Sequence, residues 1–85
     1  IRIIDVRTQD EWSEGHIENA EHFPLSDILA NRFPEARKEE ELIVQCRSGY
    51  RSNIAASVLR QAGYTHVKSL AGGSFAWSNA GYPLV

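Results

Sequence analysis

The single cysteine of the chain, Cys46, lies in a segment whose composition suits an ionised thiol. It follows the apolar residues 42–44 and precedes residues 52–62, whose apolar positions recur at helical spacing. Unpaired N–H groups at a helix N-terminus and nearby cations favour a thiolate over a thiol and so lower the pKa of cysteine. Arg47 and Arg51 supply positive charge on either side of this turn. The pattern predicts that Cys46 is a thiolate nucleophile.

The five residues after Cys46 are candidates for binding an anionic substrate in a loop over residues 46–51. Gly49 permits a tight turn, so that main-chain N–H groups converge on one point. Arg47 and Arg51 are planar cationic donors. Ser48 either donates its hydroxyl to the ligand or serves as a turn residue, and Tyr50 either lines the pocket mouth or points to solvent. Arg51 alternatively anchors the loop by bonding main-chain carbonyls.

Short apolar strands alternate with helical segments along the chain. We expect strands at residues 1–6, 20–23, 42–44 and 67–70, and helices at residues 8–12, 26–33, 52–62 and from Ser74 onward. This alternation predicts an α/β fold, namely a three-layer α/β/α arrangement with a central parallel sheet of four to five strands. Ligands of such sheets bind at the carboxyl ends of the strands, which is where Cys46 is placed.

Asp5 and Arg7 follow the first expected strand and are two residues apart, so their side chains point to the same side. Their strand end is expected to share a rim with Cys46. Two interpretations stay open: the pair supports the loop of residues 46–51 by ion pairing or hydrogen bonds, or it is an ordinary structural ion pair.

Length and composition define the class of protein. With 85 residues, 42% hydrophobic and 24% charged, the chain is expected to form one domain over residues 1–85. It has no methionine, so we expect a chain trimmed at its N-terminus or excised from a longer one. Residues 1–41 carry five basic and eleven acidic side chains, a net charge of −6, whereas residues 42–85 carry four basic and no acidic ones, a net charge of +4.

Several kinds of partner are not expected. There is no apolar run long enough for a membrane span or a signal-peptide core, so we expect no membrane association and a cytoplasmic location. The basic residues form no run suited to nucleic acid. One cysteine and three histidines are too few for a usual zinc site, so neither a metal nor a cofactor is expected.

Related cysteine chemistries differ from this pattern. Protein tyrosine phosphatases have five residues between cysteine and arginine, whereas four separate Cys46 from Arg51, which predicts a cup sized for one sulfur atom. A thioredoxin-type site needs a second cysteine. A small phosphatase or arsenate reductase is therefore disfavoured by the length of the loop.

The chain resembles the rhodanese family, and specifically its single-domain members. The matching segments occur in order along the sequence: Asp5-Val6-Arg7, Glu11-Trp12, Gly15-His16-Ile17, Ala20, Pro24, residues 46–51, Gly63-Tyr64, Gly72-Gly73, Ala76-Trp77 and Gly81-Tyr82-Pro83. The sequence departs from the pattern at Asn19, where the family has glycine, and at His22, where asparagine is common.

The resemblance implies a thiosulfate sulfurtransferase in which Cys46 carries sulfur as a persulfide. It implies a small anionic donor such as thiosulfate, and an external thiol or cyanide as acceptor, because no second cysteine is present. Rhodanese-like domains also occur fused to other enzymes, so a non-turnover module that relays sulfur to a fused or partner protein, or regulates it, is the alternative.

Overall fold

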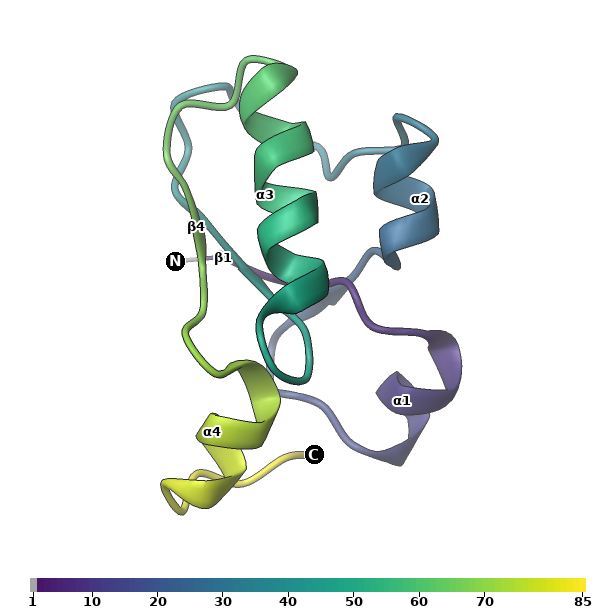
Figure 1. Cartoon of the computed structure of the whole chain (residues 1–85), viewed down its shortest axis with the longest axis vertical. Coiled ribbons are helices and arrows are strands. Elements are labelled where there is room, and N and C mark those ends of the chain that lie inside the picture. Colours follow the sequence, from purple (N-terminus) through teal and green to yellow (C-terminus); the bar gives the residue numbers. More distant parts are fainter. Residues whose placement is uncertain (1) are drawn as a thin grey trace.

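The computed structural model describes residues 2–85 and has a four-stranded parallel sheet flanked by helices (Figure 1). The elements in chain order are β1 (Arg2–Asp5), α1 (Gln9–Glu14), β2 (Glu21–His22), α2 (Leu25–Leu29), β3 (Leu42–Gln45), α3 (Tyr50–Gln61), β4 (Val67–Ser69) and α4 (Gly73–Asn79). The strand order is β2-β1-β3-β4, and all three pairings are parallel. The expected fold class is confirmed, with four strands in the sheet.

Helices α2 and α3 pack on one face of the sheet and enclose the core. Ile4 of β1 pairs with Val44 of β3, and both side chains are fully buried. The apolar stripe of α3 covers them through Ala55 and Leu59, which are also fully buried. Cys46 continues the same inward-facing row of β3 and is part of this core.

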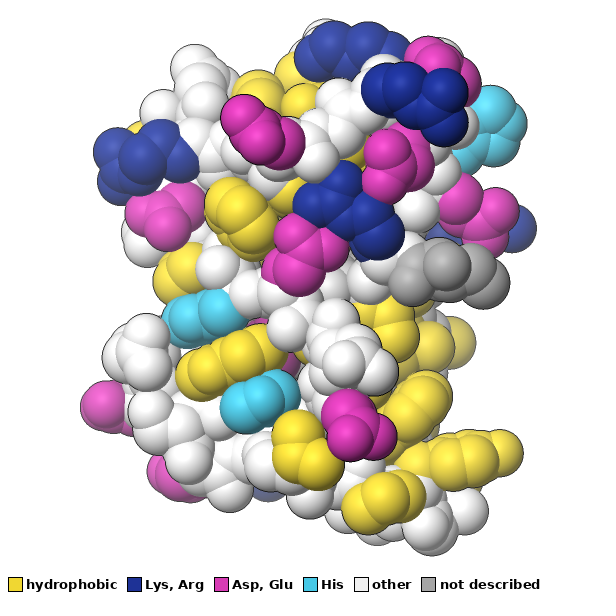
Figure 2. Space-filling view, turned by 180° about the vertical axis from the view of Figure 1, so that it is seen from behind, with side chains coloured by type: hydrophobic (Ala, Val, Ile, Leu, Met, Phe, Trp, Pro, Cys, Tyr) yellow, Lys and Arg dark blue, Asp and Glu magenta, His cyan; other side chains and the backbone are white. Residues whose placement is uncertain are grey.

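The opposite face is covered by the C-terminal part of the chain. Ile3 points away from Ile4 and shares a cavity with Ile17, Trp77 and Val85. In the view from behind, hydrophobic side chains gather at the end of the molecule where α4 and the C-terminus lie, whereas acidic and basic side chains alternate at the other end (Figure 2). Helices and terminal segments thus make the outer two layers of the three-layer arrangement.

The elements lie where the sequence predicts them, and their ends differ from the expected bounds by up to four residues. Helix α2 ends at Leu29 rather than near residue 33, because Asn31 adopts a left-handed conformation with φ 63°. Helix α3 begins at Tyr50, two residues earlier than expected. The last helix, α4, begins at Gly73, one residue earlier than expected, and Gly72 holds its N-cap position. The strand assigned to residues 1–6 covers Arg2–Asp5, and Ile1 lies outside the described residues.

Asn19 explains how the chain tolerates its departure from the family pattern. Its φ of 68° lies in the left-handed region that glycine adopts without cost. Asparagine is among the few other residues that visit this region readily. The turn between α1 and β2 therefore keeps the backbone conformation that glycine would give.

Asp5 and Arg7 form an ion pair that is shut away from solvent. Asp5 is 0% exposed and Arg7 6% exposed, and Nη2 of Arg7 lies 2.9 Å from Oδ2 of Asp5. The main-chain N–H of Arg7 also donates to Oδ1 of Asp5, and Nη2 donates to the carbonyl of Gly15. Removing one partner would leave a buried charge without compensation.

We expect Asp5→Ala to lower the free energy of unfolding by about 3–5 kcal/mol, the usual effect of breaking a buried ion pair. Chemical denaturation followed by circular dichroism measures this value. Asp27→Ala is the matched control, because the Asp27–Arg32 pair is exposed to solvent, and its loss should cost less than about 1 kcal/mol. Equal effects of the two substitutions would contradict the assignment.

Candidate active site

The sulfur of Cys46 lies inside the turn that joins β3 to α3. Its residue is 1% exposed, and it is a free cysteine. The main-chain N–H of Gly49 donates to Sγ at 3.0 Å. Gly49 has a φ of 110°, a left-handed conformation that a side chain would strain, and it stands at the N-cap of α3. The turn predicted from the glycine is therefore present and directs an amide at the thiol.

Two serine hydroxyls extend this contact into the interior. Ser52, in the first turn of α3, is fully buried, and its Oγ lies 3.7 Å from Sγ of Cys46. The same Oγ donates to the carbonyl of Gly49 at 3.1 Å and lies 2.6 Å from Oγ of Ser69 at the end of β4. The row Cys46–Ser52–Ser69 thus joins three elements by polar contacts beneath the loop.

The surroundings of Cys46 hold the pKa of its thiol below the usual range. Burial acts in the opposite direction and is the largest single effect, because desolvation disfavours a thiolate. The lowering comes next from the main-chain N–H and the hydroxyl of Ser52, and then from the main-chain N–H groups of Gly49 and Ser48. These donors together outweigh burial. The thiol thus belongs to the hydrophobic core and also faces hydrogen-bond donors of the loop and of the first turn of α3.

Helix α4 fixes the loop from the other side. The N–H of Ser74 donates to the carbonyl of Cys46 at 2.8 Å, and the N–H of Phe75 donates to the carbonyl of Arg47 at 2.9 Å. A Cβ atom on Gly73 would come within 2.1 Å of the carbonyl oxygen of Cys46, so only glycine permits this approach. Because α4 binds these carbonyls, the following N–H groups are left to face the sulfur.

Arg51 is bound to α1 and does not point freely at the thiol. Its Nη1 and Nη2 atoms lie 2.6 and 2.9 Å from Oε1 and Oε2 of Glu11, which is a bidentate ion pair. Hydrogen bonding to Glu11 raises the pKa of Arg51, and the charge of Cys46 acts in the same direction. Of the two roles considered for Arg51, the geometry agrees with anchoring of the loop, with a carboxylate rather than carbonyl groups as its partner.

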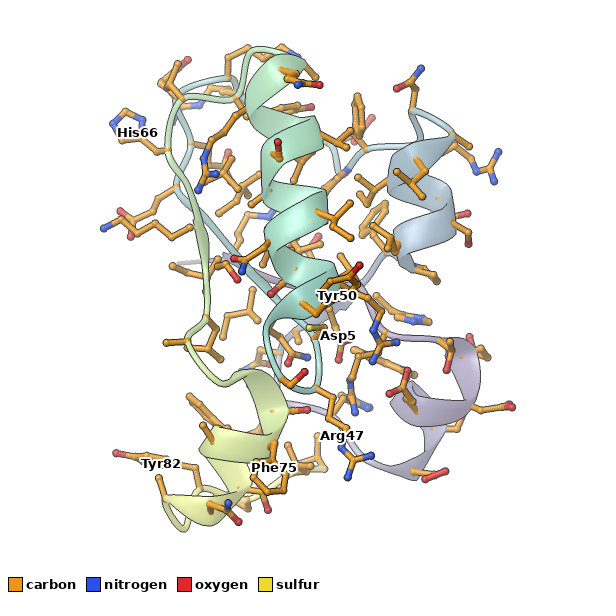
Figure 3. The ribbon with its side chains drawn as sticks, viewed as in Figure 1. Asp5, Arg47, Tyr50, His66, Phe75 and Tyr82 are labelled. Carbon is orange, nitrogen blue, oxygen red and sulfur yellow. The ribbon has the colours of Figure 1, made fainter. Side chains whose placement is uncertain are left out.

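Arg47 and Tyr50 point to different places. Arg47 extends from the loop toward the space between α1 and α4, on the side where Phe75 lies (Figure 3). There it lines a cavity of about 310 Å³ together with Arg7, Glu11 and Ser74. Tyr50 is 75% exposed and borders a separate hollow on the surface of α3. Of the two roles considered for Tyr50, its position agrees with pointing to solvent.

Asp5 and Arg7 approach the site without bonding to the loop of residues 46–51. Within residues 2–85, their side-chain hydrogen bonds run between the two residues and to Gly15. Arg7 nevertheless lines the cavity that Arg47 enters. Of the two interpretations, the contacts agree with the structural ion pair, which places Arg7 beside the loop.

Sequence reasoning did not assign site roles to Ser52, Ser69, Gly73 or Glu11. Ser52 and Glu11 were noted only as a helix start and as part of a family signature. Ser52 lies only six residues from Cys46, whereas the contacts of Ser69 and Glu11 join positions 17 and 40 residues apart in sequence. The capping pattern Thr8-x-x-Glu11 was a usable signal for the position of Glu11 on α1. The adjacent glycines 72 and 73 were consistent with a turn, but they did not indicate which part of the chain this turn approaches.

Two further properties concern metal ions and membranes. Within residues 2–85, no three His, Cys, Asp or Glu side chains come together as a group that could hold a metal ion. In the same part of the chain, no helix has the length and apolar character required to cross a membrane.

Comparison with known proteins identifies the family. Residues 1–80 match the family model described as Rhodanese-like domain, and the chain belongs to this family. It is 36% identical over its whole length to a sulfurtransferase of Allochromatium vinosum, 78% of which is covered. It is 36% identical over 96% of its length to the chloroplastic thiosulfate sulfurtransferase 16 of Arabidopsis thaliana, again with 78% covered. Other relatives are longer, and the chain spans 54% of the mitochondrial protein HIGH ARSENIC CONTENT 1 of Arabidopsis thaliana.

Solved structures agree with this assignment. A crystal structure of a rhodanese-like domain from Anabaena is 30% identical, with a TM-score of 0.89 over 100% of this chain and 98% of that one. A human single-domain sulfurtransferase is 27% identical, with a TM-score of 0.83 over 92% of this chain and 80% of that one. The family and these relatives support a sulfurtransferase-type function.

We expect Ser52→Ala to raise the pKa of Cys46, because the hydrogen bond between the Ser52 hydroxyl and the thiol is one of the contacts that lower this pKa. Alkylation at neutral pH should slow by roughly three- to tenfold, as expected when a thiolate loses one hydrogen bond. At alkaline pH the rates should converge, because both thiols are then ionised. The pH dependence of thiolate absorbance in the ultraviolet reports the same shift. Ser57→Ala, an exposed serine of the same helix, should leave both profiles unchanged.

Gly73→Ala tests the close approach of α4 to the loop. Gly73 has a φ of 57°, and the main chain of Cys46 and Arg47 leaves no room for a Cβ atom there. Gly81 has a φ of 89°, but nothing lies within 4 Å of a Cβ atom added to it. Gly81→Ala should therefore cost only the backbone strain, about 1–2 kcal/mol of unfolding free energy. Gly73→Ala should cost a further ~1–3 kcal/mol from overpacking and should slow alkylation of Cys46. Equal destabilisation by the two variants would argue against the contact.

Proposed function

We propose that the chain is a sulfurtransferase that moves a sulfane sulfur from a small anionic donor such as thiosulfate to an external thiol or cyanide through a persulfide on Cys46. The observation that carries the proposal is the arrangement of N–H and hydroxyl donors around one buried sulfur at a strand end. Such donors stabilise negative charge on the thiolate before the reaction and on the persulfide after it. The earlier expectation of a cytoplasmic location stays a prediction.

The first half-reaction follows from a thiolate in this position. The Cys46 thiolate attacks the outer sulfur of thiosulfate, a new S–S bond forms, and the S–S bond of thiosulfate breaks. Sulfite leaves with the electron pair, and the enzyme retains a negatively charged persulfide. Arg47 suits the anionic donor, because its guanidinium reaches the cavity beside the loop, and no ion pair joins it to another side chain of residues 2–85.

The second half-reaction returns the thiolate. A nucleophilic acceptor attacks the outer sulfur of the persulfide, the S–S bond breaks, and Cys46 regains the electron pair. With cyanide the product is thiocyanate, and with a thiol it is a new persulfide on the acceptor. This division into two steps is ordinary covalent catalysis. Cys46 is the only cysteine of the chain, so the acceptor comes from outside.

Phosphoryl transfer suits the site less well. A tetrahedral phosphate needs a wide cup with a guanidinium that faces its oxygen atoms. Here four residues separate Cys46 from Arg51, and both Nη atoms of Arg51 are engaged by Glu11. Hydrolysis of an aryl phosphate by the wild-type protein at a rate comparable with sulfur transfer would overturn this reasoning.

Intact-mass measurement after treatment with thiosulfate tests the proposal directly. The wild-type protein should gain about 32 Da, one sulfur atom, and should lose it on treatment with cyanide. Cys46→Ala should gain nothing and should release no thiocyanate in a steady-state assay. Sulfur transfer by this variant at the wild-type rate would exclude Cys46 as the carrier.

The alternative of a relay module predicts different kinetics. A turnover enzyme produces thiocyanate continuously from thiosulfate and cyanide, whereas a relay module would accept one sulfur and release it only to a partner thiol. A single burst equal to the protein concentration, without steady-state turnover, would favour the relay.

A further inference from the structure

The Glu11–Arg51 ion pair joins helix α1 to the end of the loop that carries Cys46. Glu11 is fixed on α1 by a capping box, in which its Oε1 accepts from the N–H and the hydroxyl of Thr8 while its own N–H donates to Thr8. Because these bonds hold the carboxylate in place, both of its oxygens face Arg51 in a defined orientation. The pair is half-buried, with 28% and 29% of the two side chains exposed.

The pair also lies between two cavities. Glu11 lines the cavity of about 310 Å³ that Arg47 enters, whereas Arg51 lines a second cavity of about 330 Å³ beside Val6 and Leu25. Arg7 lines both cavities. Arg51 therefore faces a mostly apolar hollow, and its charge is balanced by a carboxylate on the other side.

We infer that Glu11 is a positioning residue for sulfur transfer, which neutralises Arg51, limits the effect of that guanidinium on Cys46, and leaves Arg47 as the arginine that receives the donor. Without Glu11, two uncompensated guanidinium groups would lie at the loop. With Glu11 in place, Arg51 holds the loop to α1, and Arg47 is the cation that faces the anionic sulfur donor. This inference rests on the proposed sulfurtransferase function.

The charges near the pair support this role. Hydrogen bonding to Arg51 lowers the pKa of Glu11 to about 2, so the carboxylate is ionised throughout the neutral range. The groups that act on Arg51 besides Glu11 are Cys46 and Asp5, and Asp5 is itself paired with Arg7. The interaction between Arg51 and Cys46 is mutual, so the balance between Glu11 and Arg51 adds to the larger effects of Ser52 and of the main-chain N–H groups on the thiol.

The experiment is a double-mutant cycle with Glu11→Gln and Arg51→Gln, read out by thiolate absorbance against pH and by steady-state kinetics with thiosulfate. Glutamine at position 11 retains the capping box. Glu11→Gln should lower the pKa of Cys46 and should lower the KM for thiosulfate by roughly threefold. The substitution removes the anion that balances Arg51, and solvent only partly screens the charge that this guanidinium then exerts on the thiolate and the donor. The kcat of this variant should fall, because a less basic thiolate is a weaker nucleophile.

Arg51→Gln should shift the pKa of Cys46 in the direction opposite to Glu11→Gln. It should raise this pKa, and the double variant should return close to the wild-type value. Asp10→Asn is the matched control, since it removes the neighbouring carboxylate of α1, which forms no ion pair with Arg51 in the described residues 2–85. It should leave the pKa of Cys46 and the KM for thiosulfate unchanged. Circular dichroism and thermal unfolding verify that each variant is folded.

The inference is overturned if the pKa of Cys46 shifts in the same direction in Glu11→Gln and in Arg51→Gln. If the ion pair only held the loop in shape, loss of either partner would disturb the loop in the same way. An unchanged pKa in Glu11→Gln would overturn it as well. Thiolate absorbance needs no sulfur transfer, so this outcome is distinguishable from failure of the proposed function, which would appear as an unloaded wild-type protein in the mass measurement.

Discussion

The site depends on the orientation of a few peptide groups around one sulfur atom. A buried thiolate is unfavourable in a hydrocarbon core, and here it is compensated by N–H groups of the β3–α3 turn and by the hydroxyl of Ser52. These peptide groups can face inward because α4 binds the carbonyls of Cys46 and Arg47 from outside. The nucleophile is thus prepared by main-chain geometry that several elements define together, more than by any single charged side chain.

Charge around the site is arranged in compensated pairs. Asp5 with Arg7 is buried beneath the rim, and Glu11 with Arg51 ties α1 to the loop. Both acidic partners come from the negatively charged first half of the chain, and Arg51 belongs to the positively charged second half. The Glu11–Arg51 pair therefore joins the two oppositely charged halves of the chain at the site, and Arg47 is the loop arginine directed toward solvent-accessible space.

Sequence reasoning succeeded where local chemistry decides the structure. The β-branched and apolar runs located the strands, the stripe of Ala55 and Leu59 located α3, and the spacing of Cys46 and Gly49 located the turn. It was less informative where contacts join distant positions. Nothing in the order of residues shows that Ser69 meets Ser52, that Glu11 meets Arg51, or that Gly73 lies against the carbonyl of Cys46. These contacts depend on how the strands are ordered and how the helices pack, which a single sequence leaves undetermined.

Because α4 holds the loop in place, the loop can be completed only late in the synthesis of the chain. The residues that hold the carbonyls of Cys46 and Arg47 are Ser74 and Phe75, which leave the ribosome after every strand of the sheet. Until they arrive, no hydrogen bond from α4 holds these two carbonyls in place. We therefore expect the thiol of a nascent chain to react more slowly with oxidants and electrophiles than the thiol of the folded protein.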